Sequence, residues 1–293
     1  MVKLITDSGA DLPVELAEEY DIRVLPMYFY IEDREYQDGE IPPKQLYDEM
    51  RNGKHTKTAQ LTYMELREAF LPYAESGEPI IYLCFSSELS GTYQTACMVK
   101  QELEEAYPHM DLTILDTKCA SLGQGMVVYR IARLKAQGYE KSELVEAAQF
   151  YAQHTEHIFS VDDLTYLQRG GRVSKTSAFV GGMLNIKPVL NVDDGKLIPV
   201  KKVRGSKKVH KNMVNMVEER GHQLSQQIIG INHADDSEGA EKLQQMLKEK
   251  FGCEQFVVGL IGSVIGAHAG PGTLSVYFLN QFPEKFRGKF AYE

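Results

Sequence analysis

A cluster of small hydroxyl-bearing residues follows an uninterrupted apolar run in the first third of the chain. The run extends from residue 80 to 85, and directly after it come Ser86, Ser87, Ser90, Gly91 and Thr92. Such a run is typical of a strand that is buried on both faces of a parallel sheet. A helix that begins after it presents backbone N–H groups and the positive end of its dipole, which favour a carboxylate or a phosphate. The alternative is that Ser90 only caps the following helix, expected over 91–105.

Two other segments carry side chains suited to an anion. His268 stands among Gly, Ala and Pro residues, in what we expect to be a turn where the backbone can approach a ligand closely. Histidine titrates near neutrality and can donate a hydrogen bond to an anion. Arg169 and Arg172 bracket a pair of glycines, and a guanidinium fork matches a carboxylate or a phosphate. An ion pair with Asp162 or Asp163 is the alternative role for one of the two arginines.

Three apolar segments of the first half end in polar turns, which indicates a parallel sheet. Strands are expected over 3–8, 80–85 and 112–115, the last followed by a turn with Ser121 and Gly123 and a helix over 125–137. In open α/β sheets, ligands bind where the carboxyl ends of the strands meet, so these turns are predicted to share a binding edge. The Gly-Gln-Gly at 123–125 lacks the third glycine of a dinucleotide fingerprint, and no NAD site or other cofactor is predicted.

Local signals predict several further features of the first half. Asp11 is expected to cap a helix over 14–20. The segment 22–31 is predicted to be one strand with a bulge or an edge position at Pro26. A polar loop is expected over 58–62, followed by a helix over 63–73 that Thr62 caps.

The composition changes near residue 157, where short apolar segments begin to alternate with Gly-rich turns. Asp193-Asp194-Gly195 predicts a hairpin, and helices are expected over 207–219 and 237–251 around a strand at 227–233. We therefore predict two α/β domains. Residues 1–156 should form an α/β/α domain with a parallel sheet, and residues 157–293 should form an α/β domain with a mixed sheet.

The distribution of charge agrees with a division into two domains. The 293-residue chain has a net charge of −9, which argues against a general nucleic-acid binder. Residues 1–160 carry 27 acidic and 14 basic side chains, whereas residues 161–293 carry 14 and 18. Six Lys or Arg residues, among them Arg204, gather over 201–211. This basic stretch is either a solvated face or a contact for phosphate or an acidic partner.

The cellular setting and the metal content are predicted by elimination. The chain begins without a secretory signal and has no apolar stretch long enough to span a bilayer, so a cytoplasmic protein is expected. Its four cysteines lack the spacing of a zinc site or a disulfide framework. No metal site is therefore predicted.

Seven motifs, in order, carry a resemblance to a known family. They are ITDSGADLP, SSELSGTYQTA, SLGQG, LTYLQRGGRVS, GGMLNIKPVL, KVRGSKK and GSVIGAHAGPGTL. In this order and spacing they resemble the DegV family of bacterial fatty-acid-binding proteins over about residues 3–280. The resemblance implies that a long-chain fatty acid lies in an apolar tunnel between two α/β domains.

The resemblance also implies roles for individual residues. Ser90, with Gly91 beside it, and Thr58 would hold the fatty-acid carboxylate. His268 and Arg169 or Arg172 would lie close to this head group. Two departures concern the Thr58 loop, because Ala59 stands where relatives commonly have Ser and Leu61 where they commonly have Pro.

Some members of the family are the non-catalytic subunit of a two-part fatty acid kinase that serves phospholipid metabolism. The resemblance thus implies a separate ATP-dependent kinase partner and transient contact with a membrane surface. The arginine that matches Arg204, with its basic neighbours, would bear on the kinase reaction or on docking.

Three alternatives come from other functional classes. A serine hydrolase would use Ser90 with His268, but the GxSxG elbow and an acid to orient the histidine are missing. A sugar or dihydroxyacetone-type kinase shares the fold of the first domain, but the chain has no kinase glycine loop. An anion-sensing regulator would bind phosphate at the basic stretch over 201–211 and would need no acyl chain.

Overall fold

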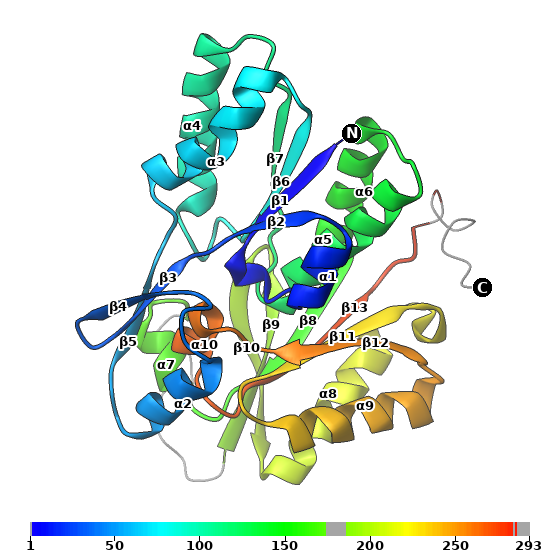
Figure 1. The fold of residues 1–293 in the computed structure, drawn as a ribbon. Coiled ribbons are helices and arrows are strands. Elements are labelled where there is room, and N and C mark those ends of the chain that lie inside the picture. The colour runs from blue at the N-terminus through cyan, green and yellow to red at the C-terminus, as the bar shows by residue number, and fades with distance from the viewer. Residues whose placement is uncertain (1, 174–185, 284, 286–293) are drawn as a thin grey trace.

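The computed structural model describes residues 2–173, 186–283 and 285, and it arranges these residues in three sheets with flanking helices (Figure 1). The first sheet is parallel and contains, in spatial order, β2 (Ile22–Leu25), β1 (Lys3–Asp7), β6 (Ile80–Cys84) and β7 (Leu112–Asp116). The second is mixed and contains β10 (Lys196–Arg204), β9 (Ile186–Asp193), β8 (Thr155–Ser160), β13 (Leu274–Leu279), β11 (Ile228–His233) and β12 (Gln255–Leu260). The third is antiparallel and contains β4 (Arg34–Gln37), β3 (Tyr28–Ile31) and β5 (Thr56–Ala59).

Helices cover both faces of the first sheet. One face packs against α3 (Tyr63–Ser76) and α4 (Thr92–Ala106), and the other against α5 (Leu122–Ala136) and α6 (Lys141–His154). The short segments η1 (Ser8–Ala10) and α1 (Val14–Glu19) follow β1. Every residue of β6 is buried, because the strand is covered on both faces, as its apolar run predicts. This sheet confirms the predicted α/β/α arrangement of the first part.

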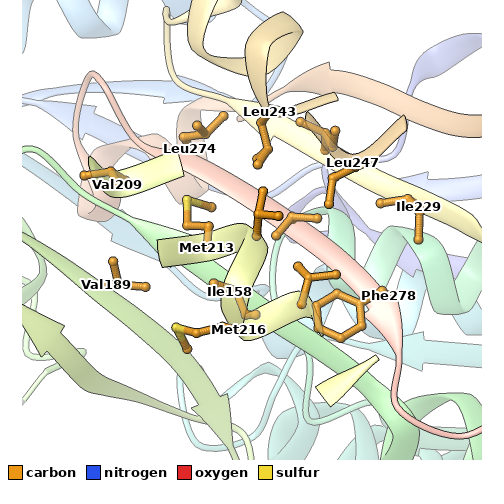
Figure 2. Close-up of a cluster of buried hydrophobic side chains, with 14 of the residues drawn as sticks. Ile158, Val189, Val209, Met213, Met216, Ile229, Leu243, Leu247, Leu274 and Phe278 are labelled. Carbon is orange, nitrogen blue, oxygen red and sulfur yellow. The ribbon is translucent and has the colours of Figure 1, made fainter. Parts of the chain in front are cut away.

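Helices pack against both faces of the second sheet. Figure 2 shows Met213 of α8 (Ser206–Arg220) and Leu243 of α9 (Ser237–Phe251) packed over its strands. The turn η2 (Leu224–Gln226) precedes β11. The opposite face receives α5, whose Met126 packs against Tyr277 of β13. Because α5 also packs on the first sheet, this one helix lies between the two large sheets.

The third sheet connects the beginning of the chain to its end. Helix α10 (Ser263–Ala269) packs against β3, β5, α2 (Pro43–Arg51) and α7 (Thr165–Arg169). The Tyr47 hydroxyl of α2 donates a hydrogen bond of 2.6 Å to the Ile261 carbonyl just before α10. The segment that begins with β3 is therefore part of the wall around α10, although it is more than 200 residues away in the sequence.

Two local predictions for the first 31 residues were wrong. The strand predicted over 22–31 is divided at Pro26, and its halves β2 and β3 belong to different sheets. Asp11 does not cap α1, whose N-cap is Pro13. The Asp11 carboxylate instead accepts a 2.9 Å hydrogen bond from the Gly262 backbone N–H at the start of α10.

Other predictions are confirmed. Residues that follow β1, β6 and β7 meet at one edge, where the Ser86 backbone N–H donates 3.0 Å to the Cys119 carbonyl. Thr62 and Glu65 form the predicted capping box, and the hairpin between β9 and β10 turns at Asp194 and Gly195. The domain boundary at residue 156 stays a prediction.

Within the described ranges, no helix is long and apolar enough to cross a bilayer, and no metal-binding cluster is found.

Candidate functional site

A mostly apolar cavity lies between the two large sheets. Its volume is about 70 Å³, and its apolar wall includes Phe85, Leu89, Phe159, Leu167 and Ile265. These side chains come from the end of β6, from β8, from α7 and from α10. Charged or titratable residues that line the same cavity are His157, Arg172, His268 and Tyr277. A space with this lining suits a ligand that is apolar over most of its length and anionic at one place.

His268 lines the cavity and has one ring nitrogen without a hydrogen-bond partner among the described residues. The residue lies on α10 and not in the turn predicted for it. Its Nε2 atom forms a 2.8 Å hydrogen bond with the Thr58 hydroxyl, and Thr58 lies in β5 and not in the predicted loop. The Nδ1 atom on the other side of the ring is buried and has no partner among the described residues. This nitrogen lies against Gly170, so closely that a Cβ at that position would collide with it. Buried polar atoms are nearly always hydrogen-bonded, so the nitrogen is a candidate for a contact with a ligand.

Burial and the nearby Arg172 cation lower the pKa of His268 to about 3. The imidazole is therefore neutral at physiological pH. If the Thr58 hydroxyl donates to Nε2, the ring carries its proton on Nδ1 and can donate to an acceptor in the cavity. A bound anion would favour the protonated ring and would raise the pKa of His268 again.

The lowered pKa makes a prediction about stability in the ligand-free protein. Unfolding restores a histidine pKa of about 6.5, so the unfolded chain takes up more protons between about pH 6.5 and 3. This part of the stability is present above that range and is lost as the pH falls. In thermal denaturation from pH 7 to pH 4, the wild type should lose stability relative to His268→Gln. If the melting temperatures of the two proteins changed in parallel with pH, this would contradict the burial of a neutral His268.

Arg172 is a partly buried cation without a carboxylate partner in the described part of the chain. Its guanidinium donates to two backbone carbonyls, from Nη1 to Gly170 at 2.6 Å and from Nε to Leu89 at 3.2 Å. Burial lowers the pKa of this guanidinium. A buried charge without a counter-ion is unfavourable. The position of Arg172 at the cavity is therefore suited to an anionic ligand.

The other predicted arginines lie elsewhere. Arg169 is the exposed last residue of α7 and does not line the cavity. Arg204 is exposed at the end of β10, with the basic stretch, and is not part of the cavity wall either. The first half of the GGMLNIKPVL motif, residues 181–185, lies outside the described residues.

The Ser90 turn lies beside Arg172 through its neighbour Leu89, the residue whose carbonyl accepts from Arg172. Helix α4 begins at Thr92 with Gly91 as its N-cap, so Ser90 is not the N-cap residue itself. Its hydroxyl nevertheless accepts 3.3 Å from the Thr92 backbone N–H, which is the capping contact that the alternative expects. The Ser90 hydroxyl lies 3.0 Å from the Thr92 hydroxyl. Ser90 is partly buried and is not among the residues that line the cavity, so its contact with a ligand stays a prediction.

The segment after β5 contacts the same turn. The Leu61 backbone N–H donates 3.3 Å to the Thr92 hydroxyl, a bond that a proline at this position could not make. The Gln60 side chain lies against Gly91 so closely that a side chain at that position would collide with it. A larger residue at position 91 would therefore force the exposed Gln60 side chain to move, and the Leu61 N–H ties the loop to α4.

Sequence reasoning missed most of the cavity wall. Phe159 and Leu167 are indistinguishable from core residues in an apolar pattern, because the cavity is itself part of the core. Ser121 was expected in a turn, but its place on the cavity wall beside Tyr277 depends on how the two sheets pack. No sequence signal short of the family motifs indicates that position.

The fold and the cavity define a class of protein before any comparison. It is an α/β protein in which a parallel and a mixed sheet enclose an apolar cavity, which is lined by a cation and by a histidine with an unpartnered ring nitrogen. A family model described as "Uncharacterised protein, DegV family" matches residues 1–281. The chain therefore belongs to the DegV family.

Curated relatives match over nearly their whole length. A DegV domain-containing protein of Clostridium perfringens is 40% identical over 285 residues, which cover 96% of this chain and 98% of the relative. One from Streptococcus pyogenes is 34% identical over 282 residues, with 95% and 98% covered.

Solved structures of DegV proteins that are described as fatty-acid-binding also match this chain. A DegV family protein from Thermus thermophilus, described for its fatty acid binding, matches with a TM-score of 0.86 at 30% identity, covering 94% of this chain and 98% of that one. The fatty-acid-binding DegV of Bacillus subtilis matches with a TM-score of 0.81 at 27% identity, covering 94% and 98%.

Proposed function

We propose that this chain binds a long-chain fatty acid, with the carboxylate near Arg172 and His268 and the acyl chain in the apolar cavity. One observation carries the proposal: a mostly apolar cavity is lined by a partly buried arginine without an acidic partner in the described chain and by a histidine with an unpartnered ring nitrogen. The fatty-acid binding of the Thermus thermophilus and Bacillus subtilis relatives supports the same ligand.

The two ends of the ligand would contribute differently. The acyl chain supplies affinity, because each buried methylene contributes about 0.8 kcal/mol before ordering costs. The carboxylate must be fully hydrogen-bonded once it leaves water. Arg172, the His268 Nδ1 atom and the Ser90 hydroxyl are the donors proposed for it, and Thr58 would hold the imidazole in the donating form. Arg169 is exposed, so we assign the ion pair to Arg172.

The cavity must widen to accept such a ligand. Its volume of about 70 Å³ is well below the roughly 300–1,000 Å³ of pockets that hold drug-sized ligands. Side chains of its wall, such as Phe85 and Leu197, therefore have to move when an acyl chain enters. Titration of the protein with a sixteen-carbon fatty acid tests the function, and incubation with an acyl ester under the same conditions tests for hydrolysis. The proposal requires saturable uptake of the acid and no turnover of the ester.

Replacement of Ser90 by alanine should weaken fatty-acid binding by about 1–3 kcal/mol, because the carboxylate would be left short of one donor. The affinity can be measured by calorimetry, with Ser76→Ala, far along α3, as the hydroxyl-loss control. An affinity of Ser90→Ala equal to that of the wild type would remove Ser90 from the head-group site.

A finer part of the proposal concerns the use of the bound acid. The protein would present the carboxylate to a separate ATP-dependent kinase subunit, which forms the acyl phosphate. Exposed Arg204 and its basic neighbours would then serve docking or the kinase reaction. With ATP alone the protein should leave the fatty acid unchanged. With the partner present, hydroxylamine should trap an acyl phosphate, and Arg204→Gln should reduce its rate of formation.

A further inference from the structure

Asp11 belongs to the ITDSGADLP motif but has no part in the head-group site proposed above. Its carboxylate contacts three parts of the chain that are far apart in sequence. One oxygen accepts 2.9 Å from the Gly262 backbone N–H. The other accepts from the Ser121 hydroxyl and, at 3.4 Å, from the Asn232 side-chain amide. The residue thus joins the loop after β1 to α10, to α5 and to β11.

The contact with Gly262 fixes the beginning of the helix that carries His268. Helix α10 is seven residues long, so its first and last turns are almost adjacent. A displacement at Gly262 is therefore transmitted to His268 within two helical turns. Asp38 accepts from the Ser263 backbone N–H and from the Ser8 side chain, so it ties α10 to η1, whereas Asp11 ties α10 to Ser121 on the cavity wall.

The contact with Ser121 fixes a part of the cavity wall. Ser121 lines the cavity and has a φ of 54°, a left-handed conformation that is unusual for serine. Its hydroxyl donates to Asp11 and accepts 2.8 Å from Asn232, whose carbonyl oxygen accepts 3.1 Å from the Tyr277 hydroxyl. These bonds hold a strained backbone in place.

We infer that Asp11 is a positioning residue for the head-group site: it holds α10, and through it His268, at a fixed distance from the Ser121 side of the cavity. The inference rests on the proposed function, because the head-group donors must keep their geometry for a carboxylate to be bound well. Asp11 acts through Gly262 and does not itself contact the ligand. A carboxylate suits this place, because all three groups that contact it are hydrogen-bond donors. The side-chain amide of an asparagine would place its own N–H donor against one of them.

The test compares an acid with the alcohol of the same length. In Asp11→Asn, the affinity for the twelve-carbon acid should fall about tenfold, because the donors for the carboxylate shift. The affinity for the twelve-carbon alcohol should stay within about twofold, because the alcohol relies on the apolar wall. Asp33→Asn, which removes one charge at an exposed position, is the matched control and should change neither affinity.

A second variant keeps the test independent of the aspartate itself. An alanine at Gly262 would place its Cβ 2.7 Å from the Asp11 carboxylate and would displace it, while the backbone φ of −68° is ordinary for alanine. Gly262→Ala should therefore reproduce the loss of acid affinity if Asp11→Asn fails to fold. Equal losses for the acid and the alcohol in the folded variants, or an unchanged acid affinity, would overturn the positioning role.

The inference can be separated from the proposed function. If the wild type binds neither ligand, the proposed function fails, but the role of Asp11 in positioning His268 can still be tested in the ligand-free protein. In that case the imidazole NMR signals of His268 should move in Asp11→Asn relative to the wild type and to Asp33→Asn. Unchanged signals would overturn the link between Asp11 and His268.

Discussion

Replacing Arg172 by glutamine is expected to weaken fatty-acid binding by about 30- to 150-fold. Removal of a charged hydrogen-bond partner costs about 2–3 kcal/mol, and each 1.4 kcal/mol is a factor of ten in affinity. The cost is large here because no acidic side chain in the described chain accompanies Arg172, so its charge is free for the ligand. Calorimetric titration with palmitate measures the effect directly.

The control for this substitution lies three residues earlier. Arg169→Gln removes the same charge from an exposed position, and its affinity should stay within about twofold of the wild type, since exposed charges contribute little. A fatty alcohol should bind Arg172→Gln almost as well as the wild type. A loss in Arg169→Gln as large as in Arg172→Gln would transfer the head-group role to the exposed arginine.

Shortening the ligand from sixteen to ten carbons should lower the affinity by about two to three orders of magnitude. Six buried methylenes contribute about 5 kcal/mol in gross terms, and the ordering of a flexible chain offsets part of this. The apolar wall from Phe85, Phe159 and Leu167 would supply this contribution. A series of saturated acids, titrated under identical conditions, gives the free energy per methylene.

The same series separates the two ends of the site. In Arg172→Gln the free energy per methylene should equal that of the wild type, while the whole series shifts to lower affinity. An affinity that does not depend on chain length would place the acyl chain outside the apolar cavity. It would also favour a site that recognises only the anion.

Much of the fold could be predicted because burial leaves a direct mark on sequence. The apolar run that ends at Phe85 indicates a strand covered on both faces, and β6 is buried throughout. The division of 22–31 at Pro26 could not be predicted in the same way. The second half of this segment pairs with β5, and such a long-range pairing has no local signal.

The site residues could be predicted as types but not as an arrangement. The Gly- and Pro-rich surroundings of His268 indicate a turn, yet the segment is a helix whose first N–H is bonded to Asp11 from 251 residues away. Likewise, Arg169 and Arg172 are equivalent in the sequence. They differ only because Arg172 turns back toward the carbonyls of Gly170 and Leu89. The motifs thus indicate the chemistry, and tertiary packing decides which side chain performs it.

The most direct test of fatty-acid binding is mass spectrometry of the protein as purified, first in the native state and then after solvent extraction. We expect one long-chain fatty acid per chain, which would also identify the preferred acyl group. A protein that is empty, and that takes up no fatty acid when one is added, would contradict the central claim.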